Sequence, residues 1–200
     1  MTSRSTLLTA VTASVGLAIA VAATTANGEP ALERAVALSA AAARSPALAR
    51  AQLPSDVFRS RSSHPANQAA AADIARTSRR AFSDDRGEAF VFLNNDDELC
   101  LEWRRRTVEV AGSSCTPVDS PHLPGVLMGT GATMDEPILA SMVEPGVGHV
   151  VVEQADGSTI DVAVRDGVFV YQGRTPFVLH WQGVGGEEHS RRVTAVDPPA

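Results

Sequence analysis

The sequence predicts a mainly β protein: a small antiparallel β sandwich or barrel with one disulfide, preceded by an Ala-rich N-terminal region that is partly helical or disordered. Three observations lead to this fold class. Short apolar runs separated by turn residues begin at Glu88 and continue almost to the end of the 200-residue chain. The dipeptide Asp156-Gly157 lies between two such runs, where it favours a tight hairpin turn. The only two cysteines, Cys100 and Cys115, lie in the first part of this pattern.

Charge is divided unevenly along the chain, whose formal net charge is −6. Residues 1–80 contain nine arginines and four acidic residues, a net charge of +5. Residues 81–200 contain eight arginines and nineteen acidic residues, a net charge of −11. Nucleic acids are bound mainly by basic residues that neutralise phosphates, so the acidic part of the chain predicts no nucleic-acid partner.

Residues 1–26 have the organisation of a signal peptide. A short segment with Arg4 precedes an uncharged apolar run at 7–23, and Thr24 and Ala26 fit the −3 and −1 positions of a cleavage site. We therefore expect a secreted or cell-envelope-associated protein, with no integral membrane span once the signal is cleaved. The alternative is an uncleaved anchor, because the apolar run is close to the minimum of roughly 17 residues that spans a bilayer.

Residues 27–80 read as an Ala-, Pro- and Arg-rich tether. Helical propensity predicts a helix at 31–43, with Leu32, Val36 and Leu38 on related faces, that ends before Pro46. Residues 67–82 are a second helical candidate. Few large apolar residues are present, which favours a partly disordered tether. The alternative is that residues 53–58 dock on the sheet.

The β domain is predicted at 81–196, followed by a tail at 197–200. Its first half contains a hairpin: residues 89–93 and 98–103 flank a turn of asparagine and aspartate, and Leu99, Leu101 and Trp103 share one face. Further apolar runs occur at 107–110, 125–129 and 138–143, of which the last is also compatible with a helix. Residues 112–114 are expected to form a turn that leads into Cys115.

The second half predicts a meander of four strands at 149–154, 159–164, 168–171 and 177–181. Val150 and Val152 would face inward, opposite Ile160, Val162 and Val164. We expect residues 190–196 to add an edge strand. The predicted core residues of this half are aromatic: Phe169, Tyr171, Phe177 and Trp181.

The two cysteines are predicted to form a structural disulfide, because their spacing is not CxxC and no histidine lies nearby in the sequence. We expect no metal site. The histidines lack HxxxH or HExxH partners, and residues 94–98 lack the alternating ligand spacing of a calcium loop. The histidines considered are His64, His122, His149, His180 and His189.

No catalytic residues and no cofactor are predicted. The glycines of residues 125–131 lack the Lys-Ser/Thr of a phosphate loop, and no nucleophile motif with a helper histidine or lysine occurs. The alternative is a secreted hydrolase whose Asp and Glu residues converge only in three dimensions. A third interpretation, a protease inhibitor, would use the loop at 116–124.

The favoured function is therefore an exported, non-catalytic β domain that binds a protein or cell-envelope partner. Three consecutive arginines form a local basic spot in the acidic domain, which favours a solvated strand end over an anion receptor. In the alternative to a core position for Trp181, this residue and the turn at 172–176 would edge a binding surface. The residues predicted for this possible surface are Arg104, Arg105, Arg106, His122, Arg174 and Trp181.

Three segments carry a resemblance to a known group of proteins: VFLNNDDELCLEW with the following SSC, MVEPGVGHVVVEQADGSTIDVAVRDGVFVY, and the upstream LPSDVF with SRRAF. Together they resemble an uncharacterised family of exported actinobacterial proteins that share a single cysteine pair and a β meander. The resemblance covers about residues 53–179. It implies a secreted single-disulfide β domain with no assigned activity.

Overall fold

The computed structural model describes residues 28–58, 71–72, 74–106, 111–129 and 136–194. The signal peptide predicted at 1–26, the strand predicted at 107–110 and the tail at 197–200 lie outside these residues. Among the helices that are described, none is both long enough and apolar enough to cross a membrane.

The described chain forms three antiparallel sheets, which confirms the mainly β fold class. Sheet A contains, in spatial order, β1 (Arg79–Ser83), β2 (Gly87–Leu93), β3 (Glu98–Arg105) and β4 (Ala111–Pro117). Sheet B contains β5 (Gly125–Met128), β6 (Ile138–Met142) and β9 (Val168–Gln172). Sheet C contains β11 (Glu188–Val193), β10 (Phe177–Gln182), β7 (His149–Gln154) and β8 (Thr159–Ala163).

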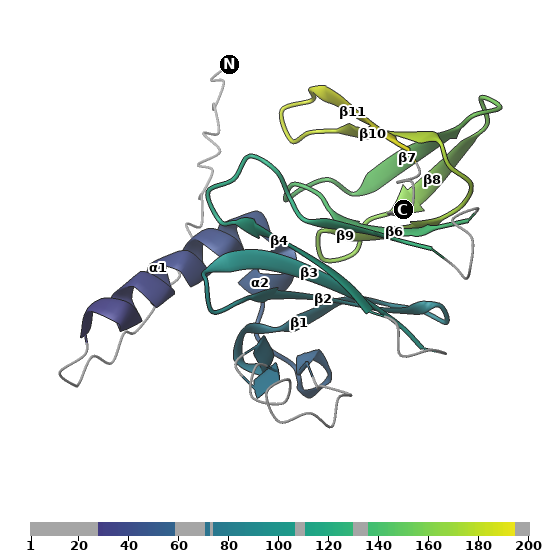
Figure 1. Cartoon of the computed structure of the whole chain (residues 1–200). Coiled ribbons are helices and arrows are strands. Elements are labelled where there is room, and N and C mark those ends of the chain that lie inside the picture. Colours follow the sequence, from purple (N-terminus) through teal and green to yellow (C-terminus); the bar gives the residue numbers. More distant parts are fainter. Residues whose placement is uncertain (1–27, 59–70, 73, 107–110, 130–135, 195–200) are drawn as a thin grey trace, which may run out of the picture.

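The sheets are stacked in layers with sheet B in the middle (Figure 1). Strand β6 is buried along its whole length, because its alternate residues face two different cores. Ala140 and Met142 pack with sheet A, whereas Leu139 packs with sheet C. The core between A and B contains the predicted inward residues of β3 and Trp103, which is fully buried. A strand buried on both faces explains why β6 has no polar alternation in the sequence.

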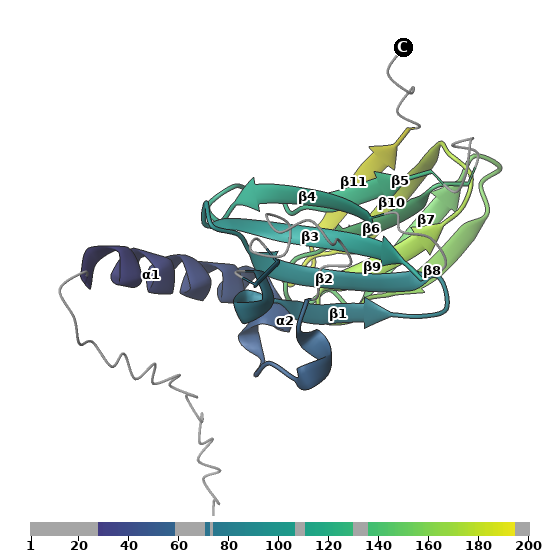
Figure 2. The same cartoon turned by 60° about the horizontal axis from the view of Figure 1, so that its bottom comes forward.

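The N-terminal region packs against sheet A at two places. The helices α1 (Gly28–Arg44) and α2 (Pro46–Ala49) contribute buried residues to the core between A and B. After the 3-10 helix η1 (Pro54–Asp56), Phe58 packs edge-on against Phe90 of β2, with ring centroids 5.7 Å apart. Figure 2 shows β1 to β4 side by side, with α2 beside β1. Residues 53–58 are thus docked on the sheet, and β1 begins at Arg79, inside the segment assigned to the tether.

Helix α1 confirms the predicted helix and its end before Pro46, but the expected apolar face is wrong. Leu32 and Val36 are 61% and 62% exposed, whereas Ala37 and Ala41 are buried. Small alanine side chains let the helix backbone approach the sheet closely, so the alanine face is the one that packs. The predicted second helix at 67–82 is also wrong at its end, because Phe82 lies in β1. Helical residues are found at 71–72 and 74–77.

The predicted hairpins at 89–103 and 149–164 are confirmed, but three details differ. Residues 112–114 lie in β4 rather than in a turn, because they pair with β3 on the side that β2 leaves open. The four-strand meander is wrong: β9 pairs with β6, so it lies in sheet B, and β10 pairs directly with β7. Ile160 lies opposite buried Val152 yet is 45% exposed, because β8 is at the edge of sheet C.

Candidate binding site

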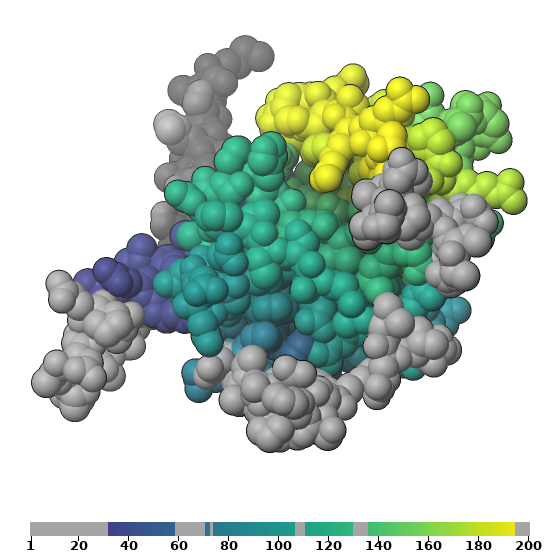
Figure 3. All heavy atoms as spheres, viewed as in Figure 1, coloured from purple at the N-terminus to yellow at the C-terminus, as the bar shows by residue number. Residues whose placement is uncertain are grey.

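A hollow of about 680 Å³ opens between sheets B and C. Its floor contains Ser141, Val143 and Phe169 of sheet B and the loop after β6, and its roof contains residues of β10 and β11. The loop between β4 and β5 forms a side wall with Pro121, His122 and Leu123. Figure 3 shows this opening between the teal atoms of that loop and the yellow atoms of the C-terminal strands. The volume lies in the range of small-ligand sites, roughly 300 to 1,000 Å³.

The roof of the hollow contains an aromatic pair. Trp181 of β10 and His189 of β11 are directly opposite in the strand register, and their rings stack at 5.3 Å with an angle of 15° between the planes. Trp181 is only partly buried, unlike Trp103. A flat apolar group can therefore enter the hollow and pack against rings that are already oriented.

The register of β11 places Arg191 on the same side as the aromatic pair. Arg191 is opposite Leu179, and His189 is opposite Trp181, so these residues share the face of sheet C that looks toward sheet B. Arg191 is exposed at the hollow, and its guanidinium makes no hydrogen bond or ion pair with any other described residue. The neighbouring Arg192 is opposite Val178 and lies on the outer face. The hollow therefore combines apolar and polar lining residues with one exposed guanidinium.

The side wall of the hollow is fixed from α1. The Arg44 guanidinium donates hydrogen bonds to the carbonyl oxygens of Val118 at 2.7 Å, Pro117 at 3.3 Å and His122 at 3.0 Å. Arg34, ten residues earlier, similarly donates to the Leu93 carbonyl and the Asp97 carboxylate of the β2–β3 turn. The last residue of a helix assigned to the tether thus positions the loop that carries His122.

Of the residues predicted for a binding surface, the structure brings only His122 and Trp181 together, in this hollow. Arg104 lies over the Phe58 ring at 3.6 Å and pairs with Glu102 at 2.5 Å. Arg105 donates to the Gly129 carbonyl at 3.0 Å. Alternation along β3 sends these two neighbours to opposite faces of sheet A.

The remaining two predicted arginines also lie apart from the hollow. Arg106 donates to the Asp84 carbonyl at 2.6 Å and to the Ser83 hydroxyl at 2.8 Å, in the β1–β2 turn. Arg174 is 81% exposed and lies 3.7 Å from Glu136. The three consecutive arginines therefore make local structural contacts and do not form one patch.

Sequence reasoning missed His189 and Arg191 as members of the site. The signal was present: an edge strand was expected at 190–196, and residues two apart on a strand share a face. His189, Arg191 and Val193 follow that period. What the sequence could not show is which face of β11 lies above the hollow.

Three of the described histidines lie close to an acidic residue. His149 lies 3.0 Å from Asp161, His180 lies 2.9 Å from Glu153, and His189 lies 3.7 Å from Glu187. His64 is outside the described residues. Within the part of the chain that the structure describes, no group of three or more His, Cys, Asp or Glu residues could hold a metal ion.

The side-chain oxygens of residues 94–98 are used within their own turn. Asn94 Oδ1 accepts hydrogen bonds from the backbone N–H groups of Asp96 at 3.0 Å and Glu98 at 2.9 Å. Asp97 has a positive φ of 57° and pairs with Arg34. This geometry is that of an Asx turn closing the hairpin.

Ser141 is the hydroxyl residue in the floor of the hollow. It is 5% exposed, and its Oγ donates to the Met142 carbonyl at 3.3 Å. Among the described residues, no histidine is hydrogen bonded to this hydroxyl. Nucleophilic catalysis by serine requires a base within hydrogen-bond reach, so the present contacts do not activate Ser141.

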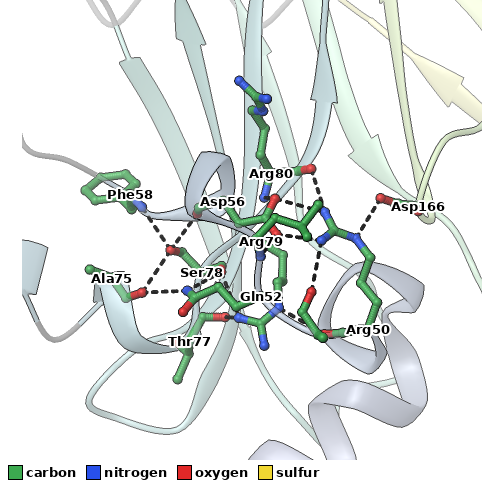
Figure 4. Close-up of polar contacts among 12 residues, drawn as sticks. Arg50, Gln52, Asp56, Phe58, Ala75, Thr77, Ser78, Arg79, Arg80 and Asp166 are labelled. Carbon is green, nitrogen blue, oxygen red and sulfur yellow. Dashed lines mark hydrogen bonds and ion pairs between the residues drawn. The ribbon is translucent and has the colours of Figure 1, made fainter.

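A second polar cluster, which we call the Asp56 cluster, contains Arg50, Asp56, Arg80 and Asp166 (Figure 4). Asp56 is 1% exposed. Its carboxylate accepts hydrogen bonds from the Arg50 guanidinium at 2.5 and 3.0 Å and from the backbone N–H groups of Leu53 at 2.7 Å and Arg80 at 3.1 Å. Arg50 also donates to Asp166 at 3.1 Å. The cluster therefore ties η1 and β1 to the turn that leads into β9.

The electrostatics of the cluster favour the ionised carboxylate. Burial by itself would raise the pKa of Asp56, but the hydrogen bonds from Arg50, Leu53 and Arg80 outweigh it and hold the pKa below the ordinary value of 3.8. The Asp56 hydrogen bond likewise raises the pKa of Arg50. A carboxylate whose acceptor positions are filled by the protein has little capacity left for a ligand, so we assign this cluster a structural role.

The disulfide between Cys100 and Cys115 is present, as predicted. The two residues are directly opposite in the register of β3 and β4. Closing a loop of 15 residues stabilises the fold by about 3 kcal/mol in the chain-entropy model. Disulfides of this kind persist in oxidising compartments, with which an extracytoplasmic location agrees.

Comparison with protein-family models, with curated proteins and with solved structures finds no match for this chain. The resemblance to exported actinobacterial single-disulfide proteins stays a prediction.

Proposed function

We propose that this chain is an exported, non-catalytic β domain that binds a protein or cell-envelope partner at the hollow between sheets B and C. The observation that carries the proposal is the stacked pair Trp181–His189, which lies partly exposed over an open hollow. Aromatic residues in such a position commonly anchor ligands, because they offer a large contact area with few rotatable bonds.

Two further observations support this reading. The wall of the hollow is positioned by Arg44 through three backbone carbonyls, so the site exists before a ligand arrives. The disulfide between β3 and β4 suits an extracytoplasmic domain.

The alternative of a secreted hydrolase gains no specific support from the described residues. The side chains of the pair His149–Asp161 are largely exposed, and neither this pair nor His180–Glu153 lines the hollow. A catalytic acid or base acts in a site that shields it from bulk water.

The proposal is tested by replacing Trp181 with alanine in the full chain and measuring retention on the cell-envelope fraction of the source organism. We expect the Trp181→Ala variant to be retained at least tenfold less than the unchanged chain, because the aromatic anchor is lost. The matched control is His180→Ala, which changes an aromatic ring on the same strand but on the outer face.

Equal retention of Trp181→Ala and the unchanged chain would contradict the proposal. Circular dichroism and urea unfolding of both variants separate a loss of binding from a loss of folding.

A further inference from the structure

An arginine whose guanidinium is exposed, Arg191, lines the roof of the hollow. Arg191 lies on the inner face of β11, opposite Leu179 of β10, and lines the hollow together with Phe169 of sheet B. An inward-pointing charge on an edge strand can serve to prevent edge-to-edge association. Here, however, the space beside the guanidinium is open and large enough for a ligand. An arginine with no partner among the described residues can therefore offer its donors to a bound anion.

The other charges near the hollow leave this positive group uncompensated. Glu144 also lines the hollow, but it lies at the side shared with a second, smaller cavity of about 220 Å³. Arg44 lines that second cavity together with Glu144. Arg44 and Glu144 thus face the same small cavity, and Glu187 lies 3.7 Å from His189, so neither carboxylate is paired with Arg191.

We propose that the hollow binds a carboxylate joined to a flat apolar body, an inference that rests on the proposed binding function. The carboxylate is held by Arg191, and the apolar body packs against Trp181 and Phe169. A planar guanidinium matches a carboxylate with two parallel hydrogen bonds. The free carboxyl end of a polypeptide with an aromatic last residue and a small aromatic acid both carry this chemistry.

The charges of the site favour a ligand with a single negative charge. Among the described residues that line the hollow, Arg191 is the one with a permanent positive charge, which matches one carboxylate. The surrounding domain, residues 81–200, has a net charge of −11, which repels polyanions such as nucleic acids or polyphosphates. Apolar contact with the floor supplies the attraction that the net charge does not.

The proposal is tested by isothermal titration calorimetry of the full chain with 2-naphthoate and with its neutral counterpart 2-naphthalenemethanol. We expect 2-naphthoate to bind with a dissociation constant below about 1 mM and the alcohol to bind about tenfold more weakly. Arg191→Gln should weaken naphthoate binding about tenfold and leave binding of the alcohol unchanged.

The control variant is Arg192→Gln, which removes the same charge from the adjacent residue on the outer face of β11. It should bind both compounds as the unchanged chain does. Equal losses in the two variants would show that only overall charge matters and would overturn the role of Arg191.

A second arm distinguishes the two sources of the carboxylate. The peptide Gly-Gly-Phe is titrated with its C-terminus free and amidated. Stronger binding of the free peptide than of 2-naphthoate identifies a polypeptide terminus as the ligand, and the reverse order identifies a small aromatic acid.

The outcomes separate this inference from the proposed function. If the alcohol binds as tightly as naphthoate and Trp181→Ala abolishes both, the hollow is a binding site and the carboxylate assignment is wrong. If neither naphthalene compound and neither peptide binds, but retention of the chain on the cell-envelope fraction still depends on Trp181, the ligand class is again wrong and the binding function stands. If retention also fails to depend on Trp181, both proposals fall.

Discussion

The Asp56 cluster and the hollow each contain an arginine near apolar residues, but they differ in how far their polar groups are satisfied. In the cluster, the buried carboxylate of Asp56 accepts four hydrogen bonds, and Arg50 contacts two carboxylates. At the hollow, the Arg191 guanidinium has no partner among the described residues and Trp181 is partly exposed. Saturated polar groups stabilise a fold, whereas groups with remaining capacity beside an open volume are suited to bind a ligand.

The largest expected difference between the two regions is in stability. Asp56→Asn leaves Arg50 without its charged partner, so we expect the free energy of unfolding to fall by about 3 kcal/mol, the low end for breaking a buried pair because Arg50 is 28% exposed. Urea denaturation at pH 7 measures this change.

The matched control for that variant is Asp161→Asn, which breaks the exposed pair with His149 and should cost less than about 1 kcal/mol. Equal losses from the two substitutions would remove the distinction between the cluster and an ordinary surface ion pair.

A smaller effect is expected from pH. The folded pKa of Asp56 is lowered, so its stabilising contribution is complete above the unfolded value near 3.8 and is lost as the pH falls through the folded pKa. The Asp56→Asn variant lacks this carboxylate and therefore this contribution at every pH. The stability gap between the two chains, measured by urea denaturation at decreasing pH, should therefore narrow below about pH 4; a gap that stays constant or widens would contradict the assignment.

The smallest effect on stability is expected from Arg44, the α1 residue that holds the loop at the side of the hollow. Arg44→Gln removes hydrogen bonds to exposed or partly buried loop carbonyls, and should lower the free energy of unfolding by about 1 kcal/mol or less. Its main result should be local: amide hydrogen exchange of residues 118–123 becomes faster, because the loop loses its anchor. Arg192→Gln is the control, and unchanged exchange in Arg44→Gln would show that Arg44 does not fix the wall.

These expectations depend on which parts of the N-terminal region are packed. The sequence favoured a tether for residues 27–80 because large apolar residues are scarce there. The structure shows that a few residues are enough: Ala37, Ala41, Leu48 and Phe58 are buried, and Arg34, Arg44 and Arg50 bond to loops and turns of the β domain. A hydrophobicity argument does not detect docking by arginine hydrogen bonds and small side chains.

The candidate site was predictable only in part. Trp181 could be named because its aromatic ring ends an alternating strand, and His122 because it lies in a proline-bounded loop. Arg104, Arg105 and Arg106 suggested a basic patch, but their side chains point to different neighbours once β3 is paired on both sides. Consecutive residues of a strand cannot share a face, and that rule argues against a patch of three neighbouring arginines.

The sequence by itself determined the mainly β class, the hairpins at 89–103 and 149–164, the disulfide and the edge strand that became β11. Each depends on local chemistry: alternation, turn residues such as Asp156-Gly157, or the absence of other partners for two cysteines. Only the tertiary structure decided that β9 pairs with β6 and not with its sequence neighbour β8. That choice arises from non-local packing, because Val168 and Val170 face one core while Phe169 and Tyr171 face the other. The middle layer it creates is the floor on which the hollow lies.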